Sequence, residues 1–200
     1  MKPFYRFART VLYPFFRWLS PVKIYGKENI PKESGYILCS NHTSMSDPFF
    51  VMTIFNKQVF FMAKAELFKN WFVRFVISHI GVFAVERGKG DMNAIRHAEN
   101  LIKEGKILGI YPEGTRHKEG PPHKAKSGIA YIAMDTKADI LPICLYREGS
   151  YKFFKKTTVR IGKLMKYDEL VSDERTDRAN LKFIVDEVTD KLTELWEMKH

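Results

Sequence analysis

The sequence predicts an α/β fold: a mixed, largely parallel sheet flanked by helices, with an N-terminal amphipathic helical segment. Short apolar stretches with strand character alternate along the chain with longer stretches of helical periodicity. This alternation is typical of a sheet covered by helices on both faces. Hydrophobic residues make up 45% of the 200 residues, which is ample for the core of one ordinary domain. No internal repeat or low-complexity linker divides the chain.

Residues 1–20 form the first predicted unit, an amphipathic membrane-contact helix with a bend near Pro14. Apolar side chains recur at helical spacing from Phe4 to Leu19, arginines interrupt them, and no acidic residue precedes Glu28. Such a helix commonly packs its apolar face on the domain. Aromatic bulk beside an all-cationic polar face is also what a helix lying in a membrane surface needs, with each cation contributing ~1 kcal/mol against anionic lipid. We favour membrane contact.

Residues 21–200 form the second predicted unit, the α/β domain. No stretch reaches the ~20 apolar residues of a membrane-spanning helix, and the N-terminal segment lacks the features of a signal peptide. The expected strands span residues 22–25, 36–39, 59–62, 81–85, 106–111, 140–145 and 157–161. The expected helices span residues 48–55, 66–78, 92–103, 127–135 and 175–196.

The formal net charge of +10 indicates an anionic partner: a nucleic acid, an anionic membrane surface or phosphate-bearing substrates. Cys39 and Cys144 each lie in an apolar, strand-like run. We interpret them as buried free thiols, typical of a reducing compartment, although two cysteines can in principle pair. The histidines other than His42 show no ligand spacing, so no metal is expected.

The turn before residue 48 is the first candidate for chemistry. An apolar run from Tyr36 to Cys39 leads into a polar turn that carries His42 and, five positions later, Asp47. A rigid strand-to-helix turn can hold a general base beside its orienting carboxylate. Two plainer interpretations stay open at this point. Asp47 followed by Pro48 also matches a helix start with aspartate as N-cap, and a lone histidine in a loop is more often structural.

Two further polar loops follow expected strands, at residues 86–91 and 112–116. Ligands of α/β folds bind at the carboxyl ends of the strands, so we expect these loops to lie on the same face as the His42 turn. Each loop alone also fits a solvated turn or a helix cap.

Four segments follow one another along the chain: Asn41-His42-Thr43-Ser44-Met45-Ser46-Asp47, Gly81-Val82-Phe83-Ala84-Val85-Glu86-Arg87, Tyr111-Pro112-Glu113-Gly114-Thr115-Arg116 and Ile140-Leu141-Pro142-Ile143. In order and rough spacing they resemble the motifs of the glycerolipid acyltransferases, and the size of the chain is most similar to that of the bacterial lysophosphatidic acid acyltransferases. Glu86 departs from the second motif, where Asp or Asn is more familiar before the arginine.

The resemblance implies transfer of a fatty acyl group from a thioester of acyl carrier protein or coenzyme A to the free hydroxyl of lysophosphatidic acid, giving phosphatidic acid in phospholipid synthesis. It implies His42 as the catalytic base, Asp47 as its orienting partner, and no cofactor besides the thioester donor. Gly114 and Thr115 are expected to offer backbone groups near the reacting oxyanion. The substrate-binding residues expected in the motifs are Arg87, Glu113, Gly114, Thr115 and Arg116, and the two arginines are the candidates for binding the acceptor's phosphate. Lys126, outside the motifs, is expected to add positive charge for a phosphate or the acyl donor.

The expected partners are the lysophospholipid, the acyl donor and an anionic membrane surface, without nucleic acid, for a peripheral (monotopic) protein on the cytoplasmic face of the cell membrane. Another acceptor, such as glycerol phosphate or a lyso-aminolipid, is the first alternative. The second is a non-catalytic basic module that binds membrane or nucleic acid. Aromatic segments 49–55 and 68–77 are interpreted as lining for the acyl chain or, more commonly, as plain core.

Overall fold

The computed structural model describes residues 3–19, 21–86, 91–149 and 156–198. Within these residues the strands form one seven-stranded sheet in the order β1-β7-β6-β2-β5-β3-β4. Neighbouring strands are parallel except β6 and β7, which are antiparallel. The predicted α/β class and all seven expected strands are therefore confirmed. The strands are β1 Val22–Tyr25, β2 Ile37–Ser40, β3 Val59–Lys64, β4 Val82–Val85, β5 Ile107–Ile110, β6 Ile140–Tyr146 and β7 Thr157–Ile161.

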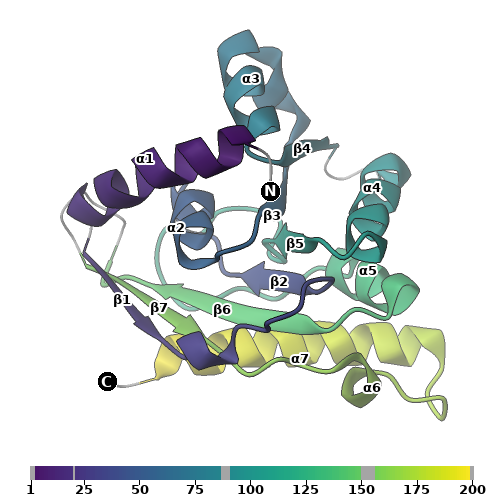
Figure 1. The fold of residues 1–200 in the computed structure, drawn as a ribbon. Coiled ribbons are helices and arrows are strands. Elements are labelled where there is room, and N and C mark those ends of the chain that lie inside the picture. Colours follow the sequence, from purple (N-terminus) through teal and green to yellow (C-terminus); the bar gives the residue numbers. More distant parts are fainter. Residues whose placement is uncertain (1–2, 20, 87–90, 150–155, 199–200) are drawn as a thin grey trace.

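Helices cover both faces of the sheet (Figure 1). Helices α1 and α2 pack on one face, while α4, α5 and α7 pack on the other. The short helices η1 and α6 were not expected from the sequence. The helices are α1 Pro3–Leu19, η1 Lys27–Asn29, α2 Asp47–Ile54, η2 Ala65–Lys69, α3 Trp71–His79, α4 Met92–Lys103, α5 Gly128–Thr136, α6 Tyr167–Leu170 and α7 Asp177–Glu197.

The two faces of the sheet carry separate hydrophobic layers. In the central strand β2, Ile37 and Cys39 point into the layer beneath α4, α5 and α7, whereas Leu38 points into the layer beneath α1 and α2. Successive side chains of a strand alternate between faces, so a central strand covered on both sides is apolar throughout. Cys39 and Cys144 are buried free thiols, as predicted.

The predicted helix at residues 66–78 is interrupted at Asn70. Asn70 has extended backbone (φ −79°, ψ 120°), and its side-chain oxygen accepts the amides of Phe72 at 3.0 Å and Val73 at 3.1 Å. This N-cap separates η2 from α3. The sequence did not reveal the break because apolar residues continue on both sides of it. None of the residues of α3 is buried, so the interpretation of this segment as plain core is wrong.

Helix α1 is apolar on two sides. Tyr5 and Ala8 are buried in the layer that α1 shares with α2, whereas Phe7, Val11 and Trp18 are exposed. Among the helices that the structure describes, none is both long and apolar enough to cross a membrane.

The three strands β2, β5 and β6 end at the same edge of the sheet. Cys39 of β2 pairs with Ile110 of β5, and Ser40 of β2 pairs with Ile143 of β6, in parallel register. The segments that follow these strands therefore lie side by side, which places the His42 turn between the loop after Ile110 and the residues after β6.

Candidate active site

A histidine and an aspartate are paired where β2 ends. His42 Nδ1 lies 2.9 Å from Asp47 Oδ2, and the aspartate is fully buried. An ionised carboxylate at Nδ1 fixes the neutral imidazole in the tautomer that carries its proton on that nitrogen. Nε2 then presents its lone pair, which is what a general base requires.

Asp47 does not cap its own helix. The N-cap of α2 is Ser46, and Asp47 occupies the next position, followed by Pro48. The Asp47 carboxylate instead turns back over the preceding turn and accepts the amides of Thr43 and Ser44, each at 2.7 Å. The cap interpretation is therefore wrong, because the carboxylate binds upstream amides and the histidine rather than the first turn of α2.

The buried Asp47 is held in its ionised form. Burial alone would raise its pKa, but the hydrogen bond from His42 and the charge of Arg147 outweigh burial, and the pKa of Asp47 lies below its ordinary value. Arg147 Nη1 donates to Asp47 Oδ1 at 2.7 Å. A buried carboxylate needs such partners to remain charged.

Arg147 is the functional residue that sequence reasoning missed. It is buried, its Nη1 also contacts the hydroxyl of Thr43, and its Nε donates to Thr157 Oγ1 at 3.1 Å. The signal was present but weak: a single arginine follows the apolar run of β6, at the edge where β2 also ends. The fourth motif stops four residues earlier, at Ile143, so the resemblance did not include Arg147.

An aromatic stack supports the imidazole from one side. The rings of His42 and Tyr111 are stacked with centroids 4.1 Å apart, and Tyr111 stacks in turn on Phe61 at 5.6 Å. Phe61 occupies the space above Gly109, where a Cβ would come within 2.3 Å of the ring. The stack restricts rotation of the His42 ring, so imidazole and carboxylate keep their alignment.

A hydrogen bond to Glu113 connects the third motif with the backbone of His42. Its Oε1 accepts the His42 amide at 3.0 Å, and the His117 amide donates to the His42 carbonyl at 2.8 Å. Its other oxygen has no hydrogen-bond partner among the described residues and lies 3.7 Å from His117 Nε2. Burial raises the pKa of Glu113 to about 7. Glu113 therefore positions the backbone of His42.

The remaining third-motif residues extend this loop towards solvent. Gly114 has a left-handed backbone (φ +73°), and its amide donates to the Tyr111 carbonyl at 3.0 Å, so that amide is already engaged rather than offered to an oxyanion. The Lys126 side chain lies against Gly114, with Nζ only 2.8 Å from where a Cβ would stand. Thr115, Arg116 and Lys126 are exposed. The loop thus carries exposed cations next to residues that contact the His42 backbone.

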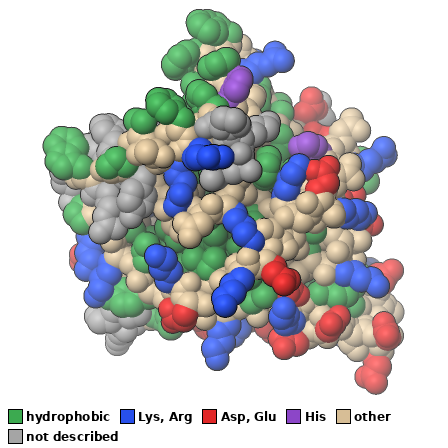
Figure 2. All heavy atoms as spheres, in the orientation of Figure 1, with side chains coloured by type: hydrophobic (Ala, Val, Ile, Leu, Met, Phe, Trp, Pro, Cys, Tyr) green, Lys and Arg blue, Asp and Glu red, His purple; other side chains and the backbone are tan. Residues whose placement is uncertain are grey.

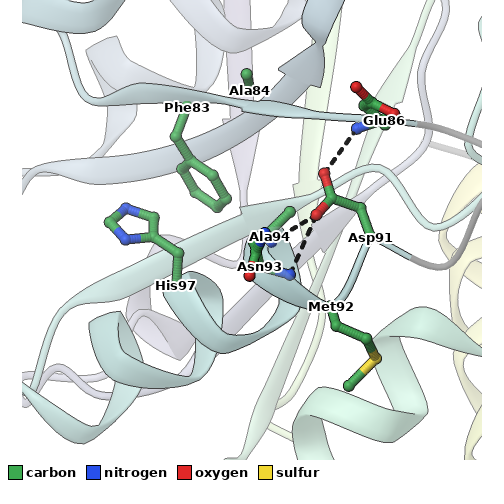
Figure 3. A pocket seen from close by; sticks show the side chains of 8 residues that line it. All are labelled: Phe83, Ala84, Glu86, Asp91, Met92, Asn93, Ala94 and His97. Carbon is green, nitrogen blue, oxygen red and sulfur yellow. Dashed lines mark hydrogen bonds between the residues drawn. The ribbon is translucent and has the colours of Figure 1, made fainter.

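Arg87, the other expected phosphate ligand, lies outside the described residues. The ends of its loop are described and lie in a surface pocket between β4 and α4 (Figure 3). The Asp91 carboxylate accepts the Glu86 amide at 2.9 Å and caps α4 by accepting the amides of Asn93 and Ala94, each at 3.1 Å. Asp91 therefore closes the loop between the end of β4 and the start of α4.

Fold and site together define an α/β enzyme with a histidine–aspartate pair at the carboxyl edge of its sheet. A sequence profile of the family described as Acyltransferase matches residues 21–146. The chain belongs to this acyltransferase family, and it is an acyltransferase. The match spans all four motifs and the α/β region that carries them.

Similar proteins bear a consistent name. The 1-acyl-sn-glycerol-3-phosphate acyltransferase of Bacillus subtilis (strain 168) is 33% identical over 159 residues, which cover 78% of this chain and 79% of that protein. The protein of the same name from Borreliella burgdorferi is 33% identical over 153 residues, covering 72% of this chain and 59% of that protein. The crystal structure of the 1-acyl-sn-glycerophosphate (LPA) acyltransferase PlsC from Thermotoga maritima has a TM-score of 0.71 at 25% identity, covering 98% of this chain and 82% of that one.

Proposed function

We propose that this protein transfers a fatty acyl group from an acyl thioester to the free hydroxyl of lysophosphatidic acid and so forms phosphatidic acid. The observation that carries the proposal is the 2.9 Å contact between His42 Nδ1 and the buried Asp47 carboxylate. The names of the similar proteins support the acceptor.

The reaction starts with the acceptor hydroxyl. An alcohol is a weak nucleophile at neutral pH, and a positioned base accelerates its attack by ~10²- to 10⁴-fold. His42 Nε2 accepts the hydroxyl proton while the oxygen bonds to the thioester carbonyl carbon. The tetrahedral intermediate then collapses with cleavage of the carbon–sulfur bond. The imidazolium returns its proton to the sulfur, which leaves the ester and a free thiol.

The surrounding groups keep the base ready. Asp47 holds the proton on His42 Nδ1 and stabilises the imidazolium that forms at the transition state. Arg147 keeps Asp47 ionised, and Glu113 fixes the backbone of His42. Because the acceptor hydroxyl is itself the attacking group, the mechanism uses no nucleophilic side chain of the protein.

The acceptor phosphate needs cations at the rim of the site. Arg116 and Lys126 are exposed beside the His42 site, and we assign them, together with Arg87, to this phosphate. A guanidinium meets phosphate oxygens with two parallel hydrogen bonds, whereas an ammonium contributes a point charge.

The acceptor and product are membrane lipids, so the protein works at a bilayer surface. We assign α1 to peripheral contact with the cytoplasmic face of the cell membrane. Its exposed side carries Phe7, Val11 and Trp18, and the charged residues of Pro3–Leu19 are all arginines. A helix of this composition lies in the interface plane without spanning the bilayer.

The test is an acceptor and donor panel with purified protein. Labelled acyl-coenzyme A and acyl carrier protein thioesters are each incubated with lysophosphatidic acid, glycerol phosphate and a lyso-aminolipid, and products are identified by mass spectrometry. We expect phosphatidic acid as the main product, and its loss by ~10²-fold or more in His42→Ala. Preference for an acceptor without phosphate would disprove the assignment, and the faster thioester identifies the donor.

A further inference from the structure

We propose that η2 and α3 form a second membrane-docking site that inserts aromatic side chains into an anionic bilayer beside α1. This site, called here the α3 surface, consists of Leu67, Trp71, Phe72 and Phe75. The inference rests on the proposed function in one respect, since that function brings the protein to a lipid surface. It adds a second contact point that belongs to the α/β domain itself.

The α3 surface is apolar and uncovered. Six of the nine residues of α3 are apolar, in the sequence Trp-Phe-Val-Arg-Phe-Val-Ile-Ser-His, and none of the nine is buried. Trp71 is 79% exposed, Phe72 60% and Phe75 50%. Isolated apolar side chains are ordinary on a protein surface, but a contiguous cluster of large ones marks an interaction site.

The exposed aromatic residues stand on an ordered element. Asn70 caps α3 with two side-chain hydrogen bonds to its first amides, and α3 packs on β4 at the edge of the sheet. Figure 1 shows α3 projecting beyond that edge, and Figure 2 shows hydrophobic side chains gathered over it. The helix therefore presents its aromatic side chains outward from the domain.

The α3 surface continues into α1. The Phe4 ring meets Phe75 edge-to-face at 6.2 Å and His79 at 5.3 Å. On α1 the exposed Phe7, Val11 and Trp18 are spaced by four and seven residues, so they lie along one line of the helix. Two segments far apart in the sequence thus join into one apolar surface, with α1 on the face of the sheet opposite α7 and α3 at the β4 edge (Figure 1).

The charges around this surface select an anionic bilayer as its occupant. Residues 64–79 contain Lys64, Lys69 and Arg74 against the single acid Glu66, which pairs with Lys64 at 2.9 Å. Residues 3–19 contain only arginines among their charged residues. Aromatic side chains surrounded by cations fit an anionic lipid surface. A second copy of this chain would bring like charges together, which opposes self-association.

Membrane contacts at both α1 and the α3 surface restrict the orientation of the domain, which one helix alone does not. A single interfacial helix leaves the domain free to rotate about it, whereas α1 and α3 together fix the orientation of the sheet against the bilayer. The α3 surface therefore sets how the carboxyl edge with His42 faces the lipid that carries the acceptor.

The first experiment follows Trp71 itself. The chain has three tryptophans, Trp18, Trp71 and Trp196, so Trp18→Phe/Trp196→Phe leaves Trp71 as the reporter. Vesicles of phosphatidylcholine and phosphatidylglycerol carrying brominated acyl chains are added to this full-length variant. We expect a blue shift and strong quenching of Trp71 fluorescence. Emission that stays unshifted and unquenched while the protein sediments with the vesicles would overturn the proposal.

The second experiment measures vesicle binding directly by sedimentation. We expect Trp71→Ala/Phe72→Ala to bind ~10- to 100-fold more weakly, since each removed aromatic contributes on the order of tenfold. Tyr131→Ala is the matched control, because Tyr131 is an aromatic residue on α5 that is 55% exposed. The control is expected to bind within about twofold of the parent. Equal binding by the double variant and the parent contradicts the proposal.

A charge pair gives an independent variant that keeps the aromatic residues. Lys69→Glu/Arg74→Glu is expected to lower binding to anionic vesicles by at least tenfold at low salt and to lose this effect in high salt. Lys182→Glu/Lys191→Glu makes the same charge change on α7, which packs on the face of the sheet opposite α1, and this variant is expected to bind more tightly than the pair at the α3 surface. If the two pairs weaken binding equally, general charge rather than the α3 surface is responsible.

The outcomes separate this inference from the proposed function. With a short-chain acceptor below its micelle concentration, Trp71→Ala/Phe72→Ala is expected to match the parent in kcat/KM, and to lose activity only on vesicle-embedded acceptor. If the parent acylates no lysophosphatidic acid in either form, the proposed function fails while Trp71 quenching still tests docking. Concentration-dependent dimerisation that the double variant abolishes, without vesicle binding, would show instead that the α3 surface binds a second copy.

Discussion

Arg147 Nη1 lies 2.7 Å from Asp47 Oδ1, on the carboxylate oxygen opposite the one that contacts His42 Nδ1 at 2.9 Å. One buried carboxylate is therefore shared between a permanent cation and the imidazole. The arginine maintains the negative charge that His42 needs, and it also fixes the plane of the carboxylate because its Nε is held by Thr157.

Replacing Arg147 by Gln should damage both stability and catalysis. Removing one partner of a buried ion pair costs about 3–5 kcal/mol, because the other charge stays buried. We expect a drop of this size in the free energy of urea unfolding and at least a tenfold fall in kcat among the molecules that remain folded. Arg147→Lys keeps the positive charge but loses the planar guanidinium. Its free energy of unfolding and its kcat should lie between those of the parent and those of Arg147→Gln.

Arg160→Gln is the control for this prediction. Arg160 is also buried, but it donates to the carbonyls of Leu195 and Trp196 at the end of α7, away from Asp47. It should lose stability with little loss of kcat per folded molecule. Equal loss of kcat in both variants would show that the effect of Arg147 is structural only.

Asp47→Asn tests the carboxylate itself, with an amide of the same shape. Without the negative charge, His42 loses its tautomer and the partner of its imidazolium, so kcat should fall by ~10²- to 10⁴-fold. Hydrogen bonds and the Arg147 charge hold the folded-state pKa of Asp47 below its ordinary value of 3.8, despite burial. Its ionised form therefore stabilises the fold above about pH 4, and that contribution disappears as the pH falls through the lowered pKa.

The stability difference between parent and Asp47→Asn should consequently be constant from pH 5 to 8 and shrink below about pH 4. Urea unfolding across this range measures it. A difference that grew on acidification would mean that the carboxylate is protonated in the native protein at neutral pH.

The pKa of Glu113 is shifted in the direction opposite to that of Asp47. Burial raises its pKa from 4.5 to about 7, so the folded state disfavours the ionised carboxylate. The protein should lose stability relative to Glu113→Gln as the pH rises from about 4.5 to 7, by up to ~3 kcal/mol. Gln retains the side-chain oxygen that accepts the His42 amide, so Glu113→Gln should stay active where Glu113→Ala does not. A stability difference independent of pH between 5 and 8 would refute the raised pKa.

The fold was largely readable from the sequence because its signals are local. Short apolar runs such as residues 36–39 and 140–145, bounded by polar turns, define buried parallel strands. The missed boundary at Asn70 depends on a side chain that bonds the backbone two and three residues ahead, within a segment whose apolar pattern continues unbroken. Helix α3 also defied the expectation that aromatic residues form core, since periodicity reports which residues share a face, not what covers that face.

The sequence predicted only part of the candidate active site. His42 and Asp47 are five residues apart, so their contact follows from one turn. Arg147 reaches Asp47 only because β6 pairs with β2 across 100 residues of sequence, and no local pattern carries that register. The position of Glu113 beside the His42 amide likewise follows from the pairing of β5 with β2.

Gly114→Ala tests whether Lys126 must lie over the third-motif loop. An added Cβ would stand 2.8 Å from Lys126 Nζ, and the left-handed backbone (φ +73°) disfavours alanine by ~1 kcal/mol or more. Gly105→Ala is the matched control, because Gly105 has a similar φ of +70° but no atom within 4 Å of an added Cβ. Both variants should lose comparable stability in urea unfolding. Only Gly114→Ala should raise KM for the phosphorylated acceptor, about five- to tenfold if one ammonium–phosphate contact of about 1–1.4 kcal/mol is lost; an equal rise in Gly105→Ala would assign the effect to backbone strain and remove Lys126 from the acceptor site.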